Sequence, residues 1–80
     1  MTIMADAEDV ANSLSVAQAA LIVWLNGEEF RDWHQKDAPG NRSTRIRLTK
    51  FTEAGGWPWF RRLTPFGSEV REALLRNPDA

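Results

Sequence analysis

Residues 62–70 read Arg-Leu-Thr-Pro-Phe-Gly-Ser-Glu-Val, and this stretch marks where an extended segment becomes the last helix. Thr64 is a good helix cap, and Pro65 suits the first helical position, where its missing N–H is not needed. The helix is expected to run from Pro65 to about Arg76, because Asn77-Pro78 then ends it. Its predicted inward face carries Phe66, Val70, Ala73 and Leu74.

The segment before this helix is predicted to be extended. Residues 57–63 are aromatic and then basic, a composition that favours a strand. Pro58 has no N–H to donate, so it restricts any strand here to a sheet edge. We therefore expect a short or vestigial β-hairpin between Trp57 and Leu63.

A further helix is predicted from Asn41 or Ser43 to Ala54, ended by Gly55-Gly56. Thr44, Leu48 and Phe51 share one face of it at spacings of four and three residues. Basic and hydroxylated side chains dominate the opposite side and its flanks: Arg42, Ser43, Arg45, Ile46, Arg47, Thr49, Lys50 and Glu53.

Another helix is predicted over residues 16–25. These residues are apolar on nearly every side, so the helix is expected to be central to the core. Ser15 and Gln18 fit a capping box, and Asn26-Gly27 is expected to end the helix with left-handed geometry. Residues 28–36 suit either a short amphipathic helix or a short strand. Residues 1–13 are acidic and small, and are expected to form a mobile N-terminal arm. Residues 77–80 form a tail.

The C-terminal pattern resembles one found in bacterial winged-helix proteins, where Leu-Thr-Pro-x-Gly leaves the second wing strand and enters the final helix. Residues 43–44 and 48–55 are similar to the recognition helix of those proteins, which starts with small hydroxyl residues and stops at an acidic-Ala-Gly sequence. The resemblance covers roughly residues 14–76. It implies a mainly α domain of three to four short helices, winged-helix-like, with a shortened wing.

The charges are sorted along the chain. Residues 1–30 hold five acids and no Lys or Arg, whereas residues 42–62 hold six bases against a single Glu53. A concentrated basic segment in a chain of net charge -1 is typical of a phosphate-binding face. We therefore expect sequence-specific binding of duplex DNA by the basic 42–54 helix, in a small bacterial or phage transcriptional regulator. The DNA-contacting residues would be Arg42, Ser43, Arg45, Ile46, Arg47, Thr49 and Lys50, with Arg61 and Arg62 on the neighbouring backbone.

Other interpretations stay open. The bases of the 42–54 helix would also serve simply to solubilise a surface helix. A protein-binding adaptor, phage or bacterial, is the leading alternative, with Trp57, Trp59 and Arg61/Arg62 as anchors. Stacking of the same aromatics on single-stranded bases is a third interpretation. Against these, large aromatics in a small chain are usually core, which would bury Trp57 and Phe60 and leave Trp59 exposed.

Composition excludes several classes of protein. The 80 residues make one domain, and the absence of cysteine excludes disulfides and thiolate metal sites. His34 is the only histidine, and the sequence offers no nucleophile and no carboxylate pair to act with it, so we do not expect an enzyme. We also expect no bound metal and no cofactor. The apolar run at 19–25 is too short to span a bilayer, so no membrane contact is expected and the protein reads as cytoplasmic. A homodimer is expected because one small module rarely supplies enough specific affinity.

Overall fold

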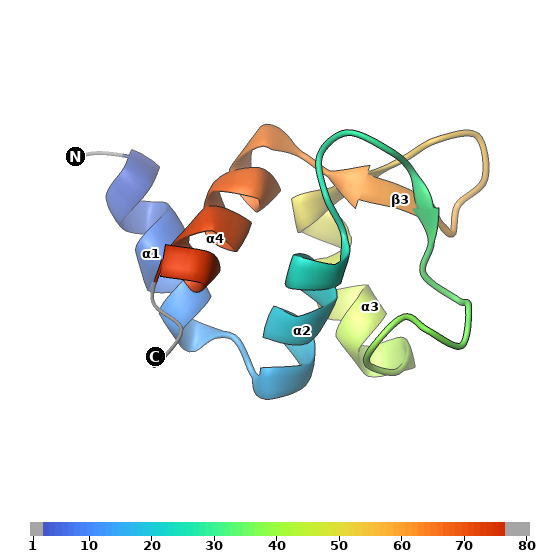
Figure 1. The fold of residues 1–80 in the computed structure, drawn as a ribbon, viewed down its shortest axis with the longest axis horizontal. Coiled ribbons are helices and arrows are strands. Elements are labelled where there is room, and N and C mark those ends of the chain that lie inside the picture. Colours follow the sequence, from blue (N-terminus) through green and yellow to red (C-terminus); the bar gives the residue numbers. More distant parts are fainter. Residues whose placement is uncertain (1–2, 77–80) are drawn as a thin grey trace.

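Four helices pack beside a small antiparallel sheet in the computed structural model, which describes residues 3–76 (Figure 1). In chain order the elements are α1 (Ile3–Ser13), α2 (Val16–Trp24), β1 (Arg31–Asp32), α3 (Arg42–Leu48), the 3-10 helix η1 (Thr49–Phe51), β2 (Thr52–Ala54), β3 (Phe60–Leu63) and α4 (Pro65–Arg76). The expected fold class is confirmed: the domain is mainly α, and its elements are compatible with a small winged-helix-like domain. None of the helices within residues 3–76 has the length and apolarity needed to cross a membrane.

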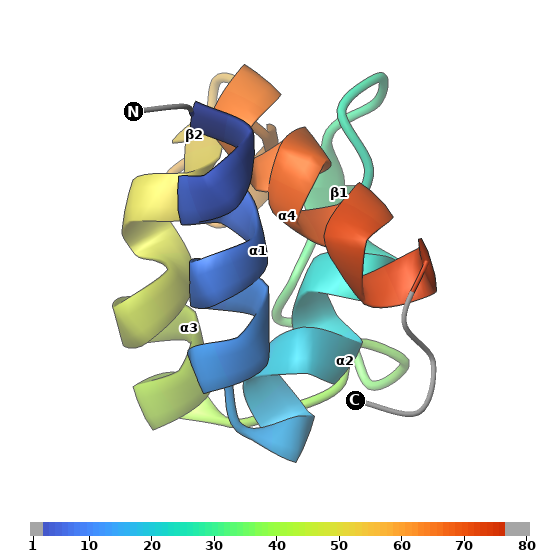
Figure 2. The same cartoon turned by 90° about the vertical axis from the view of Figure 1, so that its left-hand side faces the viewer.

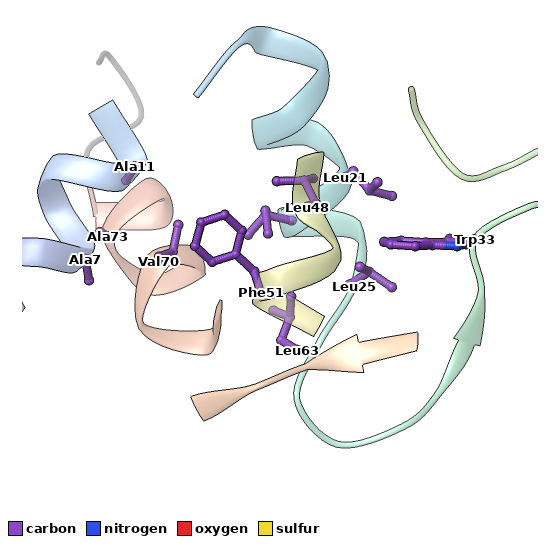
Figure 3. Packing of buried hydrophobic residues seen from close by; sticks show 11 residues of the cluster. Ala7, Ala11, Leu21, Leu25, Trp33, Leu48, Phe51, Leu63, Val70 and Ala73 are labelled. Atoms are coloured by element: carbon purple, nitrogen blue, oxygen red, sulfur yellow. The ribbon is translucent and has the colours of Figure 1, made fainter. Parts of the chain in front are cut away.

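One hydrophobic core joins all four helices to the sheet (Figure 3). The largest completely buried side chains are Leu21, Ile22, Leu25, Leu48 and Val70. Phe51 and Leu63 extend this core towards the sheet, and both are at least 95% buried, with relative exposures of 5% and 2%. On the faces predicted to point inward, Leu48, Phe51, Val70 and Ala73 are buried, while Phe66 and Leu74 pack on the margin of the core.

The start of α2 follows the predicted capping box, but its end does not follow the prediction. The Ser15 hydroxyl accepts from the Gln18 N–H at 3.1 Å, and the Gln18 side chain accepts from the Ser15 N–H at 2.9 Å. At the other end the chain leaves the helix through extended backbone at Leu25. The Asn26 side chain then accepts the N–H groups of Glu28 and Glu29, so a side-chain turn replaces the predicted left-handed stop.

The prediction of a mobile arm over residues 1–13 is wrong for the part of it that the structure describes. Residues 3–13 form α1, which packs along α4 (Figure 2). Ala7 and Ala11 are 2% and 7% exposed, respectively, and belong to the core. Small side chains let the two helices approach closely. The small residues that led to the prediction of an arm therefore permit this packing. The expected tail at 77–80 lies outside the described residues.

The predicted 42–54 helix is also too long. Regular helix stops at Leu48, η1 follows, and residues 52–54 form β2. β2 pairs antiparallel with β3 in the register Thr52 with Leu63, Glu53 with Arg62, and Ala54 with Arg61. The β-branched threonines favour strand over helix, and the pairing with β3 supplies the hydrogen bonds that decide between them.

The strand at Phe60–Leu63 lies at the centre of the sheet, whose order is β1-β3-β2, so the predicted edge position is wrong. Pro58 does not interfere because it lies in the loop 55–59, ahead of the strand. β1 pairs Arg31 with Arg61 and Asp32 with Phe60. Of the two alternatives for residues 28–36, the short strand is therefore the one observed, and it covers residues 31–32. The hairpin therefore starts at Thr52, earlier than predicted.

The junction at Thr64 explains the glycine of the C-terminal pattern. The Thr64 backbone N–H and hydroxyl both donate to the Phe51 carbonyl, at 3.0 and 3.2 Å, and the hydroxyl accepts from the Gly67 N–H at 3.1 Å. A Cβ at Gly67 would collide with the Phe51 carbonyl oxygen. Glycine is required here by this close approach of α4 to the end of η1.

Candidate nucleic-acid interface

α3 presents one side to the core and the other to solvent. Asn41 caps it, accepting the Thr44 N–H at 3.1 Å, and the buried side chains Thr44 and Leu48 fix its inner side. The side chains exposed by α3 and η1 include most of the residues predicted to contact DNA: Arg42, Ser43, Ile46, Arg47, Thr49 and Lys50, with Arg45 half-buried. The structure thus brings the predicted residues of this segment onto one continuous stretch of surface.

The four bases of this segment, Arg42, Arg45, Arg47 and Lys50, are here called the basic face. Two ion pairs occur among the side chains of residues 7–76, Arg62 with Glu53 and Arg76 with Glu8, and neither involves the basic face. Lys50 is exposed, and its ammonium lies 5.3 Å from the centroid of the Phe51 ring. The charges of the basic face are therefore free to meet an anion.

A groove of about 430 Å³ runs beside the basic face. Its walls come from α1, from the start of α2 and from α3 with η1: Val10, Ser13, Leu14, Gln18, Ile46, Arg47, Leu48, Lys50 and Phe51. Ile46 is 62% exposed at its rim, an uncommon setting for a branched apolar side chain in the middle of a basic helix. The groove separates the basic face from the acidic first helix.

Arg61 does not belong to the exposed basic surface, contrary to prediction. Its guanidinium donates to the Thr52 hydroxyl at 2.9 Å and to the carbonyl oxygens of Thr49, Thr52 and Pro58 at 3.2–3.3 Å. It also lies over the Trp33 ring at 5.3 Å. Burial lowers the pKa of this guanidinium from its ordinary value through desolvation. The Thr52 hydroxyl and three carbonyl oxygens take four of its five N–H donors, which leaves one N–H for an outside anion.

Arg62 is likewise held by internal contacts. Its Nε donates to a Glu53 carboxylate oxygen at 2.7 Å, and its guanidinium lies 4.4 Å from the centroid of the Phe30 ring. The pairing of β2 with β3 places Glu53 directly opposite Arg62, so the strand register creates this contact. A phosphate at Arg62 would compete with Glu53.

The hairpin loop at 55–59 carries an exposed aromatic stack. Trp57 and Trp59 are 59% and 38% exposed, and their rings lie 5.4 Å apart at an interplanar angle of 23°. Phe60 is half-buried. The interpretation that puts Trp57 in the core is therefore wrong, because the loop projects beyond the sheet and cannot reach the buried cluster.

Two residues near the site went unassigned in the sequence. Trp33 is 5% exposed and closes the sheet end of the core beside Leu25 (Figure 3). His34 is exposed and lies 6.3 Å from Trp59, which extends the aromatic stack to a third ring. The alternation of neighbours along a strand would have sent these two side chains to opposite sides once a strand at 31–32 was assumed.

In the described part of the chain, no three His, Cys, Asp or Glu side chains lie close enough together to hold a metal ion. Comparisons with protein-family models, with curated proteins and with solved structures gave no match to this chain.

Proposed function

We propose that this protein binds duplex DNA through the basic face, as a small bacterial or phage transcriptional regulator acting in the cytoplasm. The observation that carries the proposal is that four neighbouring bases on α3 and η1 are exposed or half-buried and have no carboxylate partner among residues 7–76. A cluster of bases on one face of a domain is the electrostatic footprint expected of a protein that binds nucleic-acid phosphates.

The dimensions of α3 suit the major groove. An α-helix with its side chains is about 10–12 Å across, and the major groove of B-DNA is about 12 Å wide. Arg42 begins α3 and Lys50 lies in η1, and these two bases would contact phosphates on either side of the groove. Ser43 and Ile46 lie between them, where a hydroxyl can bond a base edge and an apolar side chain can contact a thymine methyl.

The test is a titration with random-sequence duplex DNA at low salt and again at about 0.2 M salt, followed by fluorescence anisotropy. Each phosphate contact steepens the log–log salt dependence by about 0.9, so the double variant Arg42→Ala/Lys50→Ala should lower the slope by about 2 and weaken binding strongly. Arg76→Ala is the control, because Arg76 lies at the end of α4, away from α3 in both views (Figures 1 and 2). Equal binding by the double variant and the control would overturn the proposal.

Sequence preference and stoichiometry complete the test. Selection from a randomised duplex library should enrich one motif if α3 reads base edges. We expect two protein copies on each selected site, because one small module rarely supplies enough specific affinity. A library that returns no motif would limit the function to non-specific binding.

A protein-binding adaptor is the second candidate function. The observation that favours it is the exposure of Trp57, Trp59 and Ile46, since aromatic side chains in the open are frequent anchors of protein interfaces. Arg61 and Arg62 no longer support it, because internal contacts hold both. The adaptor function would be favoured over DNA binding by a protein partner that stays bound at 0.2 M salt and in the Arg42→Ala/Lys50→Ala variant but is lost in Trp57→Ala.

A further inference from the structure

The hairpin loop at 55–59 ends in a layered set of rings. Trp57 stacks on Trp59 at 5.4 Å, and Trp59 in turn lies 6.3 Å from His34 with an interplanar angle of 31°. Trp57 is the outermost ring and is 59% exposed. The stack therefore ends in a broad aromatic surface in contact with water.

This loop is held rigidly. The carbonyl oxygens of Trp57, Pro58 and Trp59 each accept a hydrogen bond, from the Phe60 N–H at 3.0 Å, from Arg61 Nη1 at 3.2 Å and from the Trp33 N–H at 3.2 Å. Gly56 adopts a φ of +99°, which lets the chain turn into the loop. A loop backbone held in this way loses little conformational entropy when a flat ligand stacks on a ring that the loop carries.

Arg61 couples the loop to the end of the basic face. The same guanidinium that donates to the Pro58 carbonyl also donates to the Thr49 carbonyl at 3.3 Å. Thr49 directly precedes Lys50. A single guanidinium therefore bridges the loop and the C-terminal end of the basic face. A nucleic acid lying on α3 would pass beside the aromatic stack.

The geometry points to a specific ligand for Trp57: we propose that its exposed ring stacks on an unpaired base next to a duplex that lies on the basic face. This inference rests on the proposed DNA binding and adds to it a preference for duplexes that carry an unpaired segment. Bases inside a duplex stack on their neighbours and offer no free face, whereas an unpaired base does. Stacking of this kind needs no particular base, because every base has a π-face.

The experiment compares two substrates that differ only in an unpaired segment. One is a duplex closed at both ends by hairpins, and the other is the same duplex with a single-stranded tail of several nucleotides. Stacking of one base strengthens binding by about five- to a hundredfold, so wild-type protein should prefer the tailed substrate by roughly tenfold. Trp57→Ala should reduce this ratio to about one while leaving the affinity for the closed duplex unchanged.

Matched variants separate the stack from other effects. Val16→Ala removes a side chain that is 89% exposed on α2 and should leave the ratio unchanged, whereas Trp57→Phe should keep part of the preference. The tailed substrate should also quench tryptophan fluorescence in wild type but not in Trp57→Ala. A wild-type ratio of one, or a preference that persists in Trp57→Ala, overturns this inference alone. Failure to bind either substrate overturns the proposed DNA binding as well.

Discussion

The guanidinium of Arg61 joins three segments of chain: η1 through the Thr49 carbonyl, β2 through Thr52, and the hairpin loop through Pro58. Hydrogen bonds from a charged donor to partly buried carbonyls and hydroxyls contribute more than neutral ones. Arg61→Ala should therefore lower the free energy of unfolding by about 1–2 kcal/mol, because four acceptor atoms lose a donor and the guanidinium is still partly in water. Urea denaturation followed by circular dichroism measures the change.

Arg42→Ala is the matched control for this variant. Arg42 is exposed at the start of α3, and a surface substitution of this kind changes stability by less than about 0.5 kcal/mol. Arg42→Ala should thus weaken DNA binding and change the free energy of unfolding little. Arg61→Ala should lower the free energy of unfolding and change DNA binding little. If both variants unfolded at the same urea concentration, the structural role assigned to Arg61 would be wrong.

The sequence could not separate these arginines. Both lie in the basic segment, and their side-chain chemistry is identical. What distinguishes Arg61 is its position opposite Ala54 in the hairpin and opposite Arg31 in β1, which turns its side chain over Trp33 and towards the carbonyls of η1 and β2. That position depends on strand pairing between residues far apart in the chain.

At the scale of elements, α1 is held by two small side chains that face α4. Ala7→Asp would put a carboxylate at a site that is 2% exposed, and we expect it to lower the free energy of unfolding by about 2–4 kcal/mol. The loss reflects desolvation of a charge without a partner. The midpoint of thermal unfolding measures it.

Glu8→Gln is the control on the same helix. It breaks the exposed ion pair of Glu8 with Arg76, whose atoms lie 3.2 Å apart, and such surface pairs contribute less than about 1 kcal/mol. Wild-type stability in Ala7→Asp would mean that α1 does not pack on α4 in solution and that the N-terminal segment is an arm after all.

The elements differ in how well local sequence defines them. Ser15 with Gln18 and Thr64 with Pro65 mark the starts of α2 and α4, and the structure confirms both, because capping uses side chains within a few residues of each other. The end of α3 is different. Residues 49–54 carry a pattern compatible with a helix, and only the partner strand β3 converts their second half into β2.

At the scale of the whole molecule, Phe51, Leu63 and Val70 bring η1, β3 and α4 into one core. Two probes should therefore report one transition: tryptophan fluorescence, from residues mostly near the sheet, and far-UV circular dichroism, from the helices. Val70→Ala should lower the free energy of unfolding by about 1–3 kcal/mol and shift both curves equally, because Val70 is completely buried. Separate transitions for the two probes would contradict a single cooperative core.

The sequence by itself determined the mainly α class, the capped starts of α2 and α4, most of the buried positions and the basic side of α3. These properties depend on side-chain periodicity and on capping, both of which act over a few residues. The tertiary structure alone decided that α1 packs as a helix, that β3 lies at the centre of the sheet, and that Arg61 and Arg62 are held internally. It also decided that Trp57 is exposed, because exposure, pairing and charge neutralisation depend on segments that meet only when the chain has folded.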